Sequence, residues 1–178
     1  MTFKVTFSVM LLVNVALALQ PMFEGFEQYS GAEAVEYDIR VKKINRTTTA
    51  LTGKIIIKKE LGTDFKFTMR FFHSALGNQQ FVHYPMKIPE SDVCFFTKYI
   101  YPDYEKYFVD YYTNLINAGD CPVTPRVIEV NNHVLDKKMF PRYLPAGFWK
   151  AILYGQGPGD NVSFSITANA RGDNYYGG

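Results

Sequence analysis

The chain has few of the residues on which catalytic and metal centres usually depend. It contains two cysteines, one tryptophan and three histidines in 178 residues. The histidines, His73, His83 and His133, are dispersed along the chain, and no Gly-x-Ser-x-Gly motif accompanies them. The glycine-rich residues 155–159 lack the lysine that a phosphate-binding loop requires. We therefore expect a non-catalytic protein without metal or cofactor, with all three histidines at the surface or rim of the fold.

Long apolar runs are also scarce. Residues 5–15 form an apolar stretch that is too short to span a bilayer, and no later stretch is long or apolar enough to do so. Lys4 precedes this stretch, and Ala16-Leu17-Ala18 follows with the small-x-small pattern of a signal-peptidase site. The pattern predicts a secretory signal peptide over residues 1–18 and a secreted, extracellular protein.

The chain also has no large excess of positive or negative side chains. Removing residues 1–18 takes away one lysine and leaves 18 basic and 17 acidic side chains, a net charge of +1. Binding to a phosphate backbone needs a concentrated basic face, whereas the lysine pairs of this chain are scattered. We therefore expect no nucleic-acid partner.

The remaining polar features are typical of a secreted protein. Cys94 and Cys121 are a lone pair of thiols, which an oxidising compartment is expected to join as a disulfide. Closing that loop removes denatured-state entropy worth about 3–4 kcal/mol. Asn45 and Asn161 each begin an Asn-x-Ser/Thr triplet, which predicts glycosylation at two exposed positions.

Apolar and polar residues alternate with a period of two in several segments, which is typical of half-buried strands. The alternation is clearest in residues 35–41, 65–71 and 162–168, and weaker candidates are residues 51–59, 81–88, 126–134 and 148–154. Short glycine-containing connections at residues 62–64 and 155–161 favour antiparallel pairing. The sequence therefore predicts a mainly β fold, an antiparallel sandwich or barrel of about seven strands.

One segment follows a helical period instead. After Pro102, the apolar and aromatic residues fall three and four apart, at Tyr104, Tyr107, Phe108, Tyr111, Tyr112, Leu115 and Ile116. Pro102 suits a first helical turn, and Gly119 suits a helix end. This predicts one amphipathic helix inside the Cys94–Cys121 loop. We expect a single domain over residues 19–172, followed by a flexible tail at residues 173–178.

Aromatic residues make up 16% of the chain. Strand propensity and core packing explain most of them, but not the aromatic residues of the predicted helix. Four tyrosines share the inner face of that helix, and tyrosine suits a boundary that is apolar at one end and wet at the other. Two interpretations stay open: the helix covers a cavity for an apolar ligand, or its tyrosines are ordinary core residues.

Several local patterns together resemble a known family. They are residues 41–47 (VKKINRT) leading into strands, Cys94 before an aromatic segment, Asp120-Cys121-Pro122, and residues 140–149 (FPRYLPAGFW). The chain after the signal peptide resembles the insect CheA/CheB-type chemosensory proteins, which are similar to the ganglioside-activator branch of the ML lipid-recognition superfamily. The resemblance implies an immunoglobulin-like β-sandwich whose sheets part to admit a lipid or hydrocarbon, with a role in detecting contact pheromones. Ganglioside activators have more disulfides than the one pair available here.

We therefore expect a secreted, non-catalytic binder of an apolar ligand (a lipid, hydrocarbon or pheromone) in chemosensory perception, with a membrane receptor as a further partner. The residues expected to line the ligand site share an aromatic or apolar character and an inward-facing position: Phe67, Met69, Phe71, Phe108, Tyr111, Tyr112, Trp149 and Phe164. The alternatives are a secreted protein-interaction module or receptor accessory subunit with no ligand cavity, and an activator that presents lipid to a hydrolase.

Overall fold

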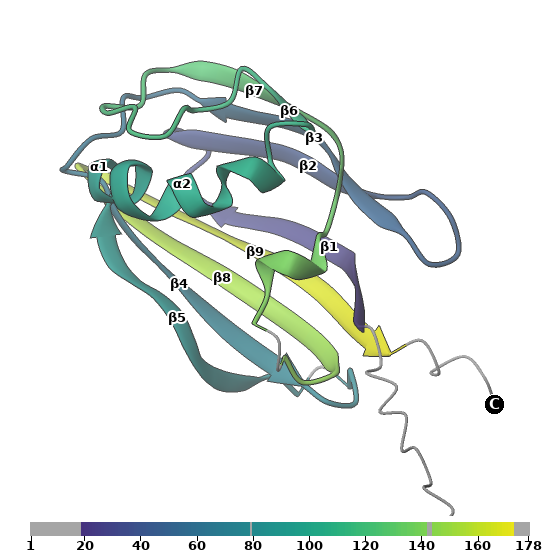
Figure 1. The fold of residues 1–178 in the computed structure, drawn as a ribbon. Helices are drawn as coiled ribbons and strands as arrows, with labels where there is room; N and C mark the ends of the chain where they lie inside the picture. Colours follow the sequence, from purple (N-terminus) through teal and green to yellow (C-terminus); the bar gives the residue numbers. More distant parts are fainter. Residues whose placement is uncertain (1–18, 79, 142–143, 173–178) are drawn as a thin grey trace, which may run out of the picture.

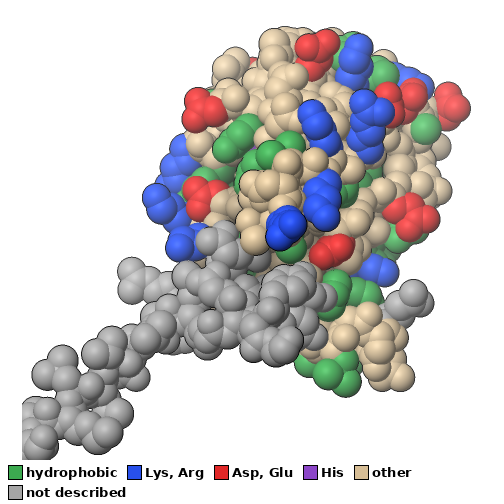
Figure 2. Space-filling view, turned by 90° about the vertical axis from the view of Figure 1, so that its right-hand side faces the viewer, with side chains coloured by type: hydrophobic (Ala, Val, Ile, Leu, Met, Phe, Trp, Pro, Cys, Tyr) green, Lys and Arg blue, Asp and Glu red, His purple; other side chains and the backbone are tan. Residues whose placement is uncertain are grey.

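The computed structural model describes residues 19–78, 80–141 and 144–172 (Figure 1). The predicted signal peptide at residues 1–18 and the predicted tail at residues 173–178 lie outside the described residues. The described part is a sandwich of two antiparallel sheets, which confirms the predicted mainly β fold class. On the face shown in Figure 2, Lys and Arg side chains are interspersed with Asp and Glu.

The larger sheet has the strand order β1-β9-β8-β4-β5. Its strands are β1 (Leu19–Ser30), β9 (Asp160–Gly172), β8 (Gly147–Gly157), β4 (Lys66–Ser74) and β5 (Val82–Asp92). The smaller sheet has the order β2-β3-β7-β6. Its strands are β2 (Val35–Lys43), β3 (Thr49–Ile57), β7 (Arg126–Val134) and β6 (Tyr112–Thr113).

The described residues form nine strands, two more than the sequence predicts. All seven predicted strands are present, and β1 and β6 are the additional ones. In β1, register shifts against β9 between Phe23 and Gly25 and between Gln28 and Ser30 interrupt the period-two pattern that reveals a strand. The other added strand, β6, is only two residues long.

The single predicted helix is present, but both of its predicted ends are wrong. The helical segment has 15 residues and comprises α1 (Val93–Phe95), the π-turn η1 (Phe96–Ile100), α2 (Tyr101–Tyr104) and the 3-10 turn η2 (Glu105–Tyr107). It begins early because Asp92 caps it, its carboxylate accepting a hydrogen bond from the Phe95 N–H at 2.8 Å. After Tyr107 the chain turns and enters β6, so the aromatic spacing of residues 108–116 belongs to a turn and a strand. A further 3-10 turn, η3 (Lys137–Met139), lies between β7 and β8.

Cys94 and Cys121 form the predicted disulfide. It joins α1 to the segment that leads into β7. Residues beside each cysteine are hydrogen-bonded to the connection between β3 and β4. Next to Cys94, the Val93 N–H donates to the Phe65 carbonyl at 3.1 Å, and close to Cys121, Val123 forms a β-bridge with Leu61. The disulfide therefore fixes the helical segment against one end of the sandwich (Figure 1).

That end of the sandwich holds the main apolar core, which we call the closed end. It is a cluster of buried side chains from both sheets, α1 and the connections: Ala34, Val35, Ile57, Leu61, Phe65, Phe67, Val93, Val123, Ile128 and Val162. A smaller cluster, formed by Phe23, Leu51 and Val130, lies further along the sandwich. The dense packing is thus concentrated at the end that the disulfide anchors.

The outer edge of the larger sheet is β5, which pairs with β4 on one side. Two prolines, Pro85 and Pro89, lie within it, each at a place where the register against β4 shifts. Proline has no N–H to donate, so it is tolerated at such an edge. No helix among the described residues is long and apolar enough to cross a membrane.

Candidate functional site

Five of the eight predicted lining residues lie on the inner face of the larger sheet. Phe67, Met69 and Phe71 alternate along β4, and the register of β4, β8 and β9 places Trp149 and Phe164 on the same face. The other three, Phe108, Tyr111 and Tyr112, come from the turn and short strand that follow the helical segment. The predicted site thus divides between two elements that face each other across the sandwich.

The inner face of the larger sheet changes character along its length. Phe67 and Phe164, near the closed end, are buried: Phe67 contacts Phe96 edge-on at 5.1 Å, and Phe164 lies 4.6 Å from the Tyr37 ring. Farther along, the inward-facing apolar side chains keep part of their surface accessible. These half-buried residues, which we call the apolar floor, are Met69, Phe71, Ala151, Ile166 and Ala168.

Trp149 borders the apolar floor and is held firmly. Its indole N–H donates a hydrogen bond to the Pro145 carbonyl at 3.0 Å. The His73 and Tyr84 rings each lie 4.7 Å from the indole, and His73 Nε2 lies 3.0 Å from the Ala146 carbonyl oxygen. A buried tryptophan with its N–H satisfied makes a rigid apolar surface.

Opposite the floor, four aromatic rings surround His133. The centroids of Phe23, Phe108, Tyr111 and Tyr112 lie between 5.0 and 5.8 Å from that of His133. His133 is only 2% exposed, so its predicted surface or rim position is wrong. His83 is exposed, as predicted, and His73 is half-buried beside Trp149.

A β-bulge in β7 explains why His133 is buried. Ile128 and Val130 point inward in ordinary alternation, which would place residue 132 inward and residue 133 outward. Instead Asn132 has a left-handed conformation with φ of 52°, and the register against β3 shifts between residues 130 and 133. The extra residue turns His133 into the interior. An asparagine, which tolerates positive φ, is the sequence signal that could have indicated this bulge.

The polar atoms inside this aromatic group are incompletely paired. The Tyr112 hydroxyl lies 2.9 Å from His133 Nδ1. Two further atoms, His133 Nε2 and the hydroxyl oxygen of Tyr101, are buried and have no hydrogen-bond partner among the described residues. Tyr101 is close by, since its ring stacks on Phe108 at 6.4 Å.

Burial governs the charge of these groups. It lowers the pKa of His133 from 6.5 to about 4, so the imidazole is neutral near pH 7. Burial also raises the pKa of the Tyr101 hydroxyl to about 12, with the nearby charge of Glu105 adding to the effect. The pKa of Tyr112 is raised too, by burial first and by Tyr101 second. The side chains of His133, Tyr101 and Tyr112 are therefore neutral near pH 7 and keep their capacity to form hydrogen bonds.

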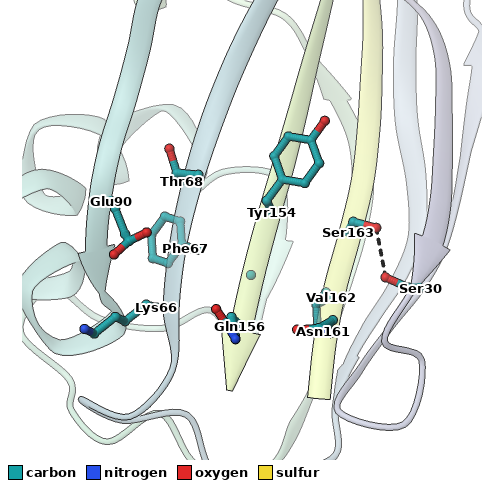
Figure 3. Close-up of a pocket in the computed structure, with 11 residues that line it drawn as sticks. Ser30, Lys66, Phe67, Thr68, Glu90, Tyr154, Gln156, Asn161, Val162 and Ser163 are labelled. Carbon is teal, nitrogen blue, oxygen red and sulfur yellow. Dashed lines mark hydrogen bonds between the residues drawn. The ribbon is translucent and has the colours of Figure 1, made fainter. Parts of the chain in front are cut away.

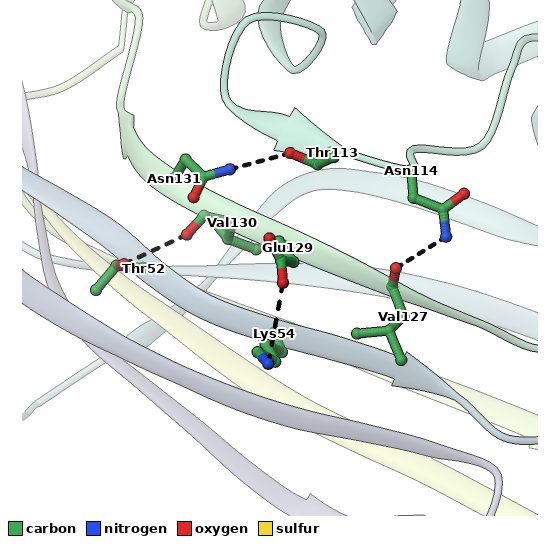
Figure 4. A network of polar contacts seen from close by, with 8 residues as sticks. All are labelled: Thr52, Lys54, Thr113, Asn114, Val127, Glu129, Val130 and Asn131. Carbon is green, nitrogen blue, oxygen red and sulfur yellow. Dashed lines mark hydrogen bonds and ion pairs between the residues drawn. The ribbon is translucent and has the colours of Figure 1, made fainter.

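A polar network on the other face of the smaller sheet holds β6 in place (Figure 4). The Asn114 amide donates to the Val127 carbonyl at 2.9 Å, and the Asn131 amide donates to the Thr113 hydroxyl at 3.2 Å. The Asn131 N–H also donates to the Tyr111 carbonyl at 2.7 Å. These bonds flank Tyr112 on both sides, so they position its hydroxyl against His133.

A pocket of about 280 Å³ lies on the opposite, outer face of the larger sheet (Figure 3). Its side chains are mostly polar, among them Lys66, Thr68, Glu90, Asn161 and Ser163. The Ser163 hydroxyl is hydrogen-bonded to that of Ser30 at 2.8 Å. The strand register places this pocket behind Phe67 and Val162 of the closed end, so it is separate from the apolar floor.

Both predicted glycosylation sites are exposed. Asn45 lies in the β2–β3 connection, where its side-chain oxygen accepts hydrogen bonds from the N–H and the hydroxyl of Thr47. Asn161 lies at the start of β9 and borders the outer pocket. Both positions leave room for a glycan, whose presence stays a prediction.

The part of the chain that the structure describes holds no group of three His, Cys, Asp or Glu side chains that could bind a metal ion. Residues 67–151 match a family described as "Protein of unknown function (DUF1091)". The matched segment runs from β4 into β8 and includes the disulfide, the helical segment, His133 and Trp149. No curated protein matches the chain. The family description carries no function, so the match is compatible with the chemosensory resemblance without establishing it.

Proposed function

We propose that the protein is a secreted, non-catalytic binder of an apolar ligand, a lipid, hydrocarbon or pheromone, in chemosensory perception. The observation that carries the proposal is the apolar floor. Met69, Phe71 and Ala151 face inward between two sheets, yet they are half-buried, whereas Phe67 and Phe164 on the same face are fully buried. Apolar surface on an inner face that its own chain leaves uncovered favours a bound apolar molecule, because covering it contributes about 25 cal/mol per Å².

The surroundings of the floor support this proposal. The disulfide and the closed end hold the two sheets together at one end, so the rest of the inner surface is preformed rather than created by the ligand. The disulfide is also compatible with secretion into an oxidising compartment. The chemosensory role rests on the resemblance to the CheA/CheB-type proteins.

Native mass spectrometry of the secreted, glycosylated protein before and after organic extraction tests the proposal. We expect a retained lipid or long hydrocarbon that extraction removes, together with a fall in melting temperature. A clean apo mass, with no stabilisation by fatty acids, cuticular hydrocarbons or glycolipids, would contradict it.

A second candidate function is a protein-interaction module, for example a receptor accessory subunit. It is favoured by three exposed aromatic side chains on the helical segment, Phe95, Tyr99 and Tyr104. Under this alternative, replacing these three residues by alanine abolishes receptor association, while the protein carries no ligand. Under the main proposal, the same replacements leave the retained ligand unchanged.

A further inference from the structure

Two buried polar atoms lie in the aromatic group around His133 without a partner among the described residues. They are His133 Nε2 and the Tyr101 hydroxyl, on side chains that are 2% and 7% exposed. A buried polar atom without a hydrogen bond destabilises the fold, and native proteins keep few of them. Replacing Tyr101 by phenylalanine would remove one of the two unpaired atoms without leaving another group unpaired, so its hydroxyl is costly where it is. A bound molecule that hydrogen-bonds these atoms would remove the penalty.

We infer that the ligand has one neutral oxygen function, a hydroxyl, aldehyde or ester group, and that His133 Nε2 and the Tyr101 hydroxyl hydrogen-bond it, while the Tyr112 hydroxyl holds the imidazole through Nδ1. This inference rests on the proposed function and narrows its ligand class. A plain hydrocarbon would leave both polar atoms unsatisfied. A hydroxyl can donate and accept, so it can satisfy either tautomer of His133 and the Tyr101 hydroxyl as well.

The same group of residues disfavours a charged ligand. The rings in contact with His133 are those of Phe23, Phe108, Tyr111 and Tyr112, none of which carries a charge. Burial keeps the imidazole itself neutral near pH 7. A carboxylate placed here would lose its hydration without gaining a cation. A fatty acid is therefore expected to bind less tightly than the alcohol of the same length.

The polar group and the apolar floor are close enough to share one ligand. Phe23, which contacts His133, pairs with Ala168 in β9, and Ala168 pairs with Trp149 in β8. Two strand spacings separate Phe23 from Trp149, about 10 Å. An oxygen at His133 would therefore leave an alkyl chain free to cover Ala168, Ala151 and Phe71.

The experiment compares tetradecane, 1-tetradecanol, tetradecanal and tetradecanoate as competitors for the fluorescent apolar probe N-phenyl-1-naphthylamine, on the delipidated, secreted protein. We expect the alcohol and the aldehyde to bind about tenfold more tightly than the alkane. Tyr101→Phe should reduce this preference several-fold, leave alkane affinity unchanged and leave the melting temperature equal or higher. Tyr37→Phe removes a hydroxyl from a half-buried tyrosine outside the group and serves as the control.

A second measurement uses the unmutated protein, so it does not depend on whether a variant folds. The ¹⁵N chemical shift of His133 Nε2 should move when 1-tetradecanol is added and stay constant with tetradecane. Equal affinities across the series, with no effect of Tyr101→Phe and no shift at Nε2, would overturn the inference and leave the proposed function standing. Failure of every compound to displace the probe or stabilise the protein would overturn both.

Discussion

The Tyr112 hydroxyl lies 2.9 Å from Nδ1 of His133, and this contact joins the two-residue strand β6 to the bulged end of β7. Different local interactions position Tyr112 and His133. Tyr112 is held by hydrogen bonds at the residues on either side of it, from Asn131 to Tyr111 and Thr113 and from Asn114 to Val127. His133 is turned inward by the left-handed conformation of Asn132. The resulting buried imidazole has consequences for stability that can be measured.

Stability should fall as the pH decreases through the range in which free histidine titrates. The folded pKa of His133, about 4, is below the ordinary value of 6.5, so the unfolded chain takes up a proton first as the pH falls. The contribution of His133 is complete above about pH 6.5 and is lost progressively toward pH 4. Between pH 7 and pH 5 the free energy of unfolding should fall by roughly 2 kcal/mol from this residue.

Urea unfolding at pH 7, 6 and 5 measures this effect, with His133→Phe as the comparison because it keeps an aromatic ring in place. The variant retains His73 and His83, so the difference between the two pH profiles isolates His133. Parallel profiles would contradict the burial of a neutral imidazole.

The bulge itself can be tested at Asn132. Because its φ is 52°, Asn132→Val should destabilise the protein by about 1–2 kcal/mol, since a β-branched residue strongly resists this conformation. Asn132→Gly is the matched control and should cost no more than a few tenths of a kcal/mol. Chemical denaturation of both variants at pH 7 gives the comparison. If the two variants are equally stable, the left-handed conformation is not required.

Filling the apolar floor should block ligand binding without harming the core. Ala151 lies on the inner face between Phe71 and Ile166 in register, so Ala151→Phe should weaken binding of N-phenyl-1-naphthylamine at least tenfold. Ile152→Phe adds bulk one position along the same strand on the outer face, and it should leave probe affinity unchanged. An equal effect of both variants would place the probe elsewhere.

Removing the disulfide should destabilise mainly by freeing the denatured chain. The bridge closes a loop between residues separated by 27 positions, for which loop-closure entropy is worth about 3–4 kcal/mol. The double variant Cys94→Ala/Cys121→Ala should therefore lose that amount in urea unfolding, and adding a reductant to the variant should change nothing further. A loss below 1 kcal/mol would show that the closed end is held by packing alone.

Much of the fold could be predicted from residue patterns, and the failures have specific physical causes. Period-two alternation identified seven strands because apolar residues recur at every second position on their inner faces, as in β4 with Phe67, Met69 and Phe71. The helix boundaries were wrong because the aromatic spacing of Phe108, Tyr111 and Tyr112 imitates a helical period while the chain actually turns around His133.

The candidate site was predictable only in part. Met69 and Phe71 could be assigned to an inner face by parity, but parity does not distinguish a half-buried residue from the buried Phe67 beside it. His133 was missed because its orientation depends on one left-handed residue, Asn132, whose effect is to reverse the alternation of β7. Period-two alternation cannot reveal a β-bulge, because the one extra residue of the bulge reverses which side chains point inward.

The prolines of β5 bear on how the protein behaves at high concentration. Pro85 and Pro89 interrupt the row of N–H groups along the free edge of the larger sheet, and the register shifts beside them bend that edge. A strand from a neighbouring molecule therefore finds no continuous ladder to extend. This edge of the larger sheet thus resists the edge-to-edge pairing from which fibrils grow.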